Sequence, residues 1–362
     1  MLDIYLDYNA TTPLRPEARE AMLDVLGPPG NPSSVHGYGQ KARFRIETAR
    51  AAVAELAGAR PEEVIFTSGG TEANAMALRR DYPSVLVSAT EHAAVLEAVP
   101  DAIRIPVDGN GVIDLAALES QLARSPEGTL VSVMAANNET GVCQPLPEII
   151  TLARKYGALV HSDAVQAFGK VPFDFSALGL DMMSVSAHKI GGPTGTGALI
   201  QREGIAANPL TRGGGQEKNR RPGTENLPGA VGFGAAAAVA RDVGASHQKA
   251  LSLRQKLEKT IEENAPDAVI FGRAAERLPN TTALAMPGHA AETQVMALDL
   301  AGIAVSAGAA CSSGKVRSSH VLEAMGAGDL AGHSIRISWG WASTEDDIDS
   351  LAERWLDLYK QA

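Results

Sequence analysis

The sequence predicts an α/β fold: a mostly parallel seven-stranded sheet with helices on both faces, joined to a smaller α+β domain. Short apolar runs alternate with longer amphipathic segments, which is the pattern of a parallel sheet covered by helices. Polar motifs follow several of these runs, where open α/β sheets bind ligands. A chain of 362 residues, 45% of them hydrophobic, also exceeds the usual size of one core.

The predicted elements follow one another in regular order. Seven apolar runs are the expected strands of the large sheet: residues 63–67, 85–88, 102–106, 130–135, 158–161, 182–186 and 198–201. Helices are expected at 16–26, 39–57, 71–80, 114–123 and 147–156, and a long helical tract at 227–264 leads into the small domain. There we expect strands near Val269, Thr282 and Ile335, a helix at 292–301 and a closing helix after Thr344. The large domain is predicted at 13–244 and the small one at 245–362.

Charge and cysteine content narrow the class of protein. A formal net charge of −10 argues against nucleic acid or an anionic membrane as the main partner, since both attract clustered Lys and Arg. The first residues carry acidic side chains instead of a targeting signal, and the longest uncharged stretch, 226–240, is too short to span a bilayer. The two cysteines, Cys143 and Cys311, form no CxxC pair, so we expect neither a disulfide nor a metal site. A cytoplasmic, reducing compartment fits these features.

An amine and a carboxylate follow two neighbouring apolar runs. Lys189 lies in Ser186-Ala187-His188-Lys189, ahead of a glycine-rich stretch, and Asp163 follows the run that ends at His161. A pyridoxal phosphate site requires these two groups: an amine that holds the aldehyde as a Schiff base, and an anion that keeps the pyridine nitrogen protonated. The pair therefore indicates this cofactor. For a single lysine or aspartate, a solvated charge or a helix cap is the alternative.

A phosphate site is expected at residues 64–71. This segment reads as a strand, a glycine turn and a helix start, which places the amides of Gly70 and Thr71 at a helix N-terminus. The chain has no Walker loop and no GxGxxG after its first strand, so a dinucleotide enzyme is disfavoured.

Several motifs in order along the chain extend this interpretation. They are YLDYNATTP at 5–13, GNPSS at 30–34, TSGGTE at 67–72, TEH at 90–92, NNETG at 137–141, RPGTEN at 221–226 and AACSSG at 309–314. With these motifs the chain resembles the class V aminotransferase-like enzymes and, among them, the cysteine desulfurases of the nitrogen-fixation and iron-sulfur-assembly type. The resemblance implies a fold type I pyridoxal phosphate-dependent transferase, in which residues 1–12 pack with the small domain.

The resemblance implies roles around the cofactor ring. Lys189 would form the Schiff base, Asp163 would pair with the pyridinium nitrogen, and Gln166 would reach the ring hydroxyl. His92 would stack on the ring and move protons, and Asn138 would hold the ring hydroxyl or the substrate. A structural histidine and a turn asparagine remain the alternatives for the last two.

The resemblance also implies a shared phosphate site. Ser186 and His188 would bind the phosphate together with Gly70 and Thr71. Thr224 resembles the family residue that completes the phosphate site of the neighbouring subunit, which implies a homodimer.

Sulfur chemistry is expected at Cys311. Its neighbours in 306–314 are small residues that bury little surface, so a thiolate that attacks the sulfur of bound cysteine is the functional interpretation and a buried small hydrophobe the alternative. Cys143 reads as core packing. Arg336 alternates with apolar neighbours, so it needs an anion, either a substrate carboxylate or an acidic side chain of the protein. The resemblance favours the substrate, with Asn31 in the same pocket.

The resemblance thus implies that L-cysteine yields L-alanine and a Cys311 persulfide, which a sulfur acceptor or iron-sulfur scaffold protein takes over. Residues 315–318 read KVRS where relatives of the nitrogen-fixation type commonly carry Ser-Leu-Glu-Pro, which leaves the acceptor open. Another pyridoxal phosphate enzyme, such as a selenocysteine lyase or an aminotransferase, is the nearest alternative. An inactive sulfur-carrier scaffold is a further one, although it has no use for Lys189, Asp163, Gln166, His92 and Arg336 together.

Overall fold

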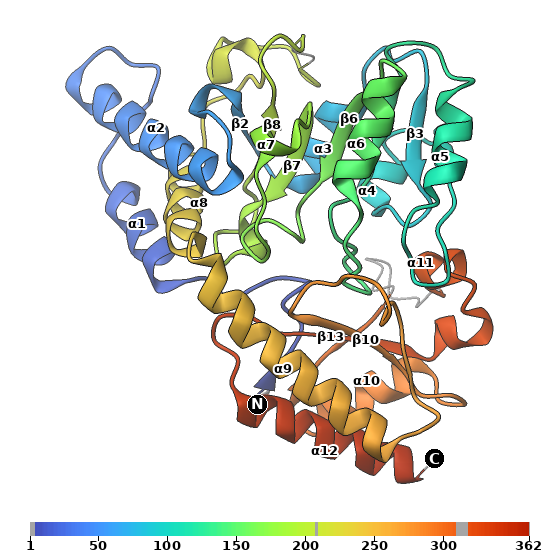
Figure 1. Ribbon diagram of the computed structural model, residues 1–362. Helices are drawn as coiled ribbons and strands as arrows, with labels where there is room; N and C mark the ends of the chain where they lie inside the picture. The colour runs from blue at the N-terminus through green and yellow to red at the C-terminus, as the bar shows by residue number, and fades with distance from the viewer. Residues whose placement is uncertain (1–3, 207–208, 309–317, 362) are drawn as a thin grey trace.

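The computed structural model describes residues 4–206, 209–308 and 318–361 (Figure 1). Its large sheet has seven strands in the order β2-β8-β7-β6-β5-β3-β4. They are β2 Val64–Thr67, β3 Val85–Ser88, β4 Ile103–Ile105, β5 Leu130–Ser132, β6 Leu159–Asp163, β7 Met182–Ser186 and β8 Gly197–Gln201. β8 runs antiparallel to both β2 and β7, and the other pairs are parallel. The predicted mostly parallel sheet is confirmed.

Neighbouring residues of each strand point to opposite faces of this sheet, and both faces are covered. Val64, Val131 and Ile200 pack in one buried cluster with three helices, α2 Gly37–Ala57, α6 Leu146–Lys155 and α8 Leu227–Ala240. Ile65 and Leu130 pack with α3 and α4 in another. A strand buried on both faces reads as a continuous apolar run, which is why these strands were detectable in the sequence.

The helices of this part follow the prediction closely. They are α1 Pro16–Leu26, α2 Gly37–Ala57, α3 Gly70–Leu78, α5 Leu115–Leu122 and α6 Leu146–Lys155, with two short unpredicted helices, α4 Ala93–Leu96 and α7 Phe175–Leu178. Asp114 begins α5 by accepting hydrogen bonds from the amides of Ala116 and Ala117. Gly58 ends α2 in the left-handed conformation, with φ of 64°.

The helical tract expected at 227–264 is confirmed, as two helices separated by a short break that was not predicted. α8 Leu227–Ala240 lacks charged residues and is largely buried against α1, α2 and the sheet, whereas α9 Val243–Asn264 is amphipathic and packs on the C-terminal part (Figure 1). The break falls at Arg241 and Asp242, where Asp242 has a non-helical ψ of 64°. It marks the point at which the chain leaves one apolar core for another.

The C-terminal part is a second layered unit. Its four-stranded antiparallel sheet has the order β12-β13-β10-β9, formed by β9 Val269–Ile270, β10 Thr281–Ala285, β12 Ser306–Ala307 and β13 Ser334–Ser338. Its helices are α10 Ala291–Leu300, α11 His320–Ala324 and α12 Glu345–Gln361. The strands expected near Val269, Thr282 and Ile335 are confirmed.

The N-terminal segment belongs to the same layer. β1 Ile4–Tyr5 pairs with β11 Ile303–Ala304, and the Tyr8 amide donates to the Ser338 carbonyl. Residues 4–8 therefore lie against the C-terminal sheet, while the following residues cross to the large sheet. Within the described ranges, no helix is long and apolar enough to cross a membrane.

Candidate functional site

A cavity of about 470 Å³ lies at the carboxyl ends of the parallel strands, between the large sheet and β13. Most of the predicted site residues line it: Gly70, Thr71, His92, Asn138, Asp163, Gln166, Ser186, His188, Lys189 and Arg336. They come from separate segments of the sequence. The fold therefore brings the predicted cofactor and substrate residues into one place.

Lys189 ends a short 3-10 turn, Ala187–Lys189, directly after β7. Its Nζ donates to the carbonyl oxygens of Asn9 and Ala10, the latter at 2.8 Å. Burial and the positive charge of Arg336 lower the pKa of Lys189 to about 8. An amine that loses its proton near neutrality is a competent nucleophile toward an aldehyde.

Asp163 ends β6 and is buried. Its Oδ2 accepts from Asn74 Nδ2 at 2.7 Å, and its Oδ1 accepts from the Val165 amide at 3.0 Å. Among the described residues, no Lys, Arg or His side chain forms an ion pair with it. A buried carboxylate with neutral donors only is suited to a cationic group that enters from the cavity.

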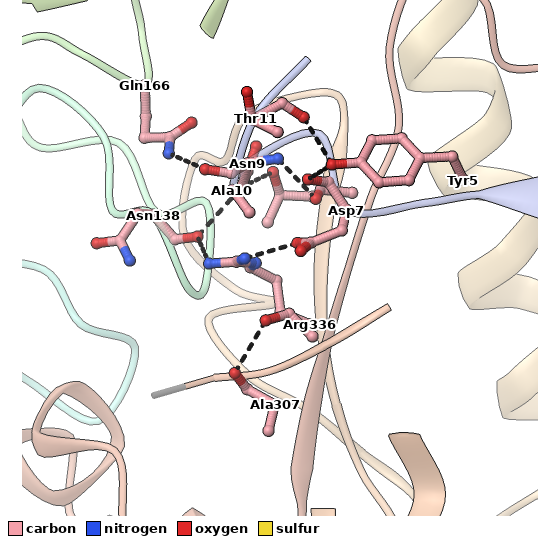
Figure 2. Close-up of polar contacts among 12 residues, drawn as sticks. Tyr5, Asp7, Asn9, Ala10, Thr11, Asn138, Gln166, Ala307 and Arg336 are labelled. Atoms are coloured by element: carbon pink, nitrogen blue, oxygen red, sulfur yellow. Dashed lines mark hydrogen bonds and ion pairs between the residues drawn. The ribbon is translucent and has the colours of Figure 1, made fainter. Parts of the chain in front are cut away.

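The N-terminal segment forms one wall of the cavity (Figure 2). Gln166 Nε2 donates to the Asn9 carbonyl at 2.9 Å, and Asn9 Nδ2 donates to the Asn138 carbonyl at 3.2 Å. Tyr5 fixes the turn from outside, since its hydroxyl donates to the carbonyls of Asp7 and Thr11. The YLDYNATTP motif therefore supplies backbone carbonyls to the site.

The predicted phosphate corner lies where α3 begins. Gly70 and Thr71 form its first turn, and Ser186 and His188 approach it from the end of β7. His188 Nδ1 contacts Thr11 Oγ1 at 3.1 Å. Burial, followed by the positive charges of Lys189 and Lys170, lowers the pKa of His188 to about 4, so the imidazole is neutral at pH 7.

Arg336 reaches the cavity from β13 and already has an acidic partner. Its Nη2 lies 2.7 Å from Asp7 Oδ1, and its Nη1 donates to the Asn138 carbonyl at 3.3 Å (Figure 2). The salt bridge that the sequence left open as an alternative is therefore present. The buried Nε has no hydrogen-bond partner in the described structure, so this donor remains for an anion.

Comparison with known proteins agrees with this geometry. The family model described as "Aminotransferase class-V" matches residues 4–351. The chain belongs to the class V aminotransferase family. It is 47% identical to a cysteine desulfurase of Cereibacter sphaeroides over 97% of this chain and 94% of that protein. It is 39% identical to the cysteine desulfurase IscS of Dictyoglomus turgidum, with 96% and 92% covered. The solved structure of a NifS-like protein from Rickettsia africae superposes with a TM-score of 0.92 at 39% identity, covering 99% of each chain.

Two predicted residues, Asn31 and Thr224, stand apart from the cavity of this class V chain. Asn31 is exposed in the loop between α1 and α2, where its Oδ1 accepts from the Ser33 amide. Thr224 borders a separate cavity of about 260 Å³, just before α8. Neither lines the Lys189 cavity of the single chain. Cys311 lies outside the described residues.

His92 lies on the rim of the cavity. It precedes α4, and its Nδ1 accepts from the Ala94 amide at 3.1 Å, so the proton of the neutral ring is on Nε2. Behind it, Glu91 is fully buried, and burial raises the pKa of its carboxyl well above the usual range.

Sequence reasoning missed several residues in and beside the cavity. Asn74 lies one helical turn after Gly70 on α3, a spacing that predicts a shared face. Lys170 lies four residues after Gln166, but no local pattern indicated that its amine turns toward the site. His320 lines the cavity and its Nε2 donates to the Glu91 carbonyl at 2.9 Å, a contact across 229 positions of sequence that no local signal could reveal.

Proposed function

We propose that this chain is a pyridoxal phosphate-dependent cysteine desulfurase, which converts L-cysteine to L-alanine and passes the sulfur through a persulfide on Cys311. The observation that carries the proposal is the pairing of Lys189 with Asp163 across one cavity. The amine is close to losing its proton, and the buried carboxylate has no cationic partner among the described residues. Relatives named cysteine desulfurase over almost the whole chain support the same activity.

The donor set fits pyridoxal phosphate. The cofactor, when bound, supplies an aldehyde for an amine and a ring that accepts an electron pair from the α-carbon of an amino acid. Asp163 would hold the protonated ring nitrogen. Gly70, Thr71, Ser186 and His188 would hold the phosphate, with amides at the start of α3 and neutral side chains as donors.

The remaining cavity residues would act on the ring and on the substrate. Gln166 and Asn138 would face the ring hydroxyl, and His92 would stack on the ring with a proton on Nε2. Lys189 Nζ would take the proton from the α-carbon of the substrate, since its lowered pKa suits a base near neutrality. Arg336 would bind the α-carboxylate through Nε, the donor that Asp7 leaves free.

The sulfur step would use the Cys311 thiolate. Its sulfur would form a bond with the sulfur of cysteine as the carbon–sulfur bond breaks, so the protein carries the persulfide and the carbon skeleton leaves as alanine. Cys143 is no substitute, because burial raises the pKa of its thiol to about 12. Delivery of this sulfur to an acceptor for iron-sulfur assembly is part of the proposal and agrees with the IscS relative.

A homodimer would complete the site. Large apolar side chains on α1 and α2 are exposed, among them Leu23 at 58% and Phe44 at 71%, and a second copy would cover them. α8 packs against both helices, and Thr224 lies just ahead of it. Thr224, and with it Asn31, would then serve the partner's cavity instead of its own.

The test is incubation of the purified protein with L-cysteine. We expect alanine, and a mass increase of one sulfur atom on the Cys311 peptide. Cys311→Ser should abolish turnover while the visible absorbance of the bound cofactor remains, whereas Cys143→Ser, the matched control, should leave both unchanged. Turnover of cysteine by the Cys311→Ser variant would favour another pyridoxal phosphate reaction. A colourless protein without a borohydride-trapped Lys189 would reject the enzyme altogether.

A further inference from the structure

Lys170 is a second amine beside the cavity, and the proposed reaction has no step for it. Its Nζ donates to Gln166 Oε1 at 2.7 Å and to Asn9 Oδ1 at 3.0 Å. No carboxylate forms an ion pair with Lys170 anywhere in the described ranges. Burial, together with the charges of Lys189 and Arg336, lowers the pKa of Lys170 well below its usual range. An amine that neutral acceptors hold beside the proposed cofactor site is a candidate for a functional role.

The contacts of Lys170 determine which way the Gln166 amide points. The Asn9 carbonyl only accepts hydrogen bonds, so the Gln166 atom beside it is Nε2, and Oε1 must then face a donor. Lys170 is that donor in either protonation state, because both the ammonium and the amine carry N–H groups. One hydrogen of Nε2 is used by Asn9, which leaves the other for a partner in the cavity.

Asn9 is fixed by the same logic. Its Nδ2 donates to the Asn138 carbonyl and to Thr281 Oγ1, so its Oδ1 is the atom that accepts from Lys170. The Asn9 carbonyl in turn accepts from both Gln166 and Lys189. Lys170 therefore holds two side chains. One is that of Asn9, whose carbonyl contacts the proposed cofactor lysine, and the other is that of Gln166, the proposed donor to the ring hydroxyl.

We propose that Lys170 is a positioning residue that keeps an N–H of Gln166, and not its carbonyl, directed at the ring oxygen of the cofactor. This inference rests on the proposed function, since it requires pyridoxal phosphate in the cavity. Without Lys170, Oε1 of Gln166 loses its donor and only the Asn9 carbonyl holds the amide. The amide is then less firmly oriented, which weakens a hydrogen bond that stabilises the ionised ring oxygen. The ring oxygen then binds more strongly the proton that it shares with the nitrogen contributed by Lys189.

The experiment is a pH titration of the visible absorption of the holoenzyme. In Lys170→Met we expect the midpoint to rise by about one pH unit, since a hydrogen bond to a charged oxygen shifts a proton equilibrium by roughly this amount. Lys170→Arg, which keeps a donor, should restore most of the wild-type midpoint. Lys155→Met, at an exposed lysine on α6, is the matched control and should leave the midpoint unchanged.

A double-mutant cycle identifies the route of the effect. If Lys170 acts through Gln166, its replacement should shift the midpoint in the wild-type background and have little effect in Gln166→Ala. Additive shifts, or no shift in a coloured and folded Lys170→Met protein, would overturn the inference while the proposed function stands. Wild-type protein that binds no chromophore would reject both.

Discussion

The ion pair between Asp7 and Arg336 allows a prediction with a magnitude. Asp7→Asn keeps the shape of the side chain and removes the charge that faces Arg336 at 2.7 Å. Removing one partner of a fully buried pair costs about 3–5 kcal/mol, because the other charge stays buried without compensation. The Arg336 side chain is 6% exposed but that of Asp7 is 19% exposed, so we expect about 2–3 kcal/mol.

Urea unfolding of the cofactor-free protein measures this cost. The double variant Asp7→Asn/Arg336→Met should recover most of the lost stability, since no unpaired charge remains. Glu119→Gln, which breaks the exposed pair with Lys155, is the matched control and should cost less than about 1 kcal/mol.

Binding provides the second half of the test. The negative charge of Asp7 offsets the attraction of Arg336 for the proposed substrate carboxylate, so Asp7→Asn should lower the KM for cysteine even as it destabilises the fold. Asp7 also raises the pKa of Lys189, and its removal should move that pKa below about 8. Unchanged urea midpoints for Asp7→Asn together with an unchanged KM would show that the pair has neither effect.

Three further predictions follow from titration and exposure. Borohydride-trapped attachment of pyridoxal phosphate to Lys189 should accelerate as pH rises through about 8. Since the unfolded chain keeps this proton up to its ordinary pKa of 10.5, the stability of the apoprotein should also rise between about 8 and 10.5. Lys189→Met should make that rise smaller, with the remainder due to Lys170. Burial lowers the pKa of His161 from 6.5 to about 3, so the unfolded state binds the extra proton and stability should fall as pH drops from 6.5 toward 3; urea unfolding of His161→Phe should show a shallower acid limb. Phe44→Glu should shift the protein toward monomers in size-exclusion chromatography with light scattering, and a dimer that persists unchanged would place the interface elsewhere.

The sheet and the cofactor corner were readable from the sequence because their signals are local. A strand buried on both faces is a continuous apolar run, and the Gly70-Thr71 turn reads directly as a strand followed by a helix start. Asp163 and Lys189 could be paired in advance, because carboxyl ends of neighbouring parallel strands meet at one edge of the sheet.

The parts that sequence did not reveal depend on distant contacts. The break at Arg241 and Asp242 was not predicted, because glycines such as Gly234 and Gly244 also lie inside the two helices and composition therefore does not single out the break. The change of core decides where the helix ends. The alternation of Arg336 with apolar residues predicted an anionic partner. It did not show whether this partner is a substrate carboxylate or an acidic side chain of the protein. Asp7, which is 329 positions away, makes that choice through the pairing of the N-terminal segment with β13.

The hydrogen-bond acceptors around Lys189 explain why its amine can lose its proton near neutral pH. Nζ donates to two backbone carbonyls, of Asn9 and Ala10, which accept from a neutral amine as well as from an ammonium. A carboxylate in their place would hold the proton and raise the pKa. The acid of the same segment, Asp7, is directed at Arg336 instead, so it compensates one buried cation. It raises the pKa of Lys189 through its charge but forms no ion pair with this amine. The N-terminal segment thus separates two positive groups with different proposed roles: a guanidinium that would stay charged to bind an anion, and an amine that would lose its proton to react.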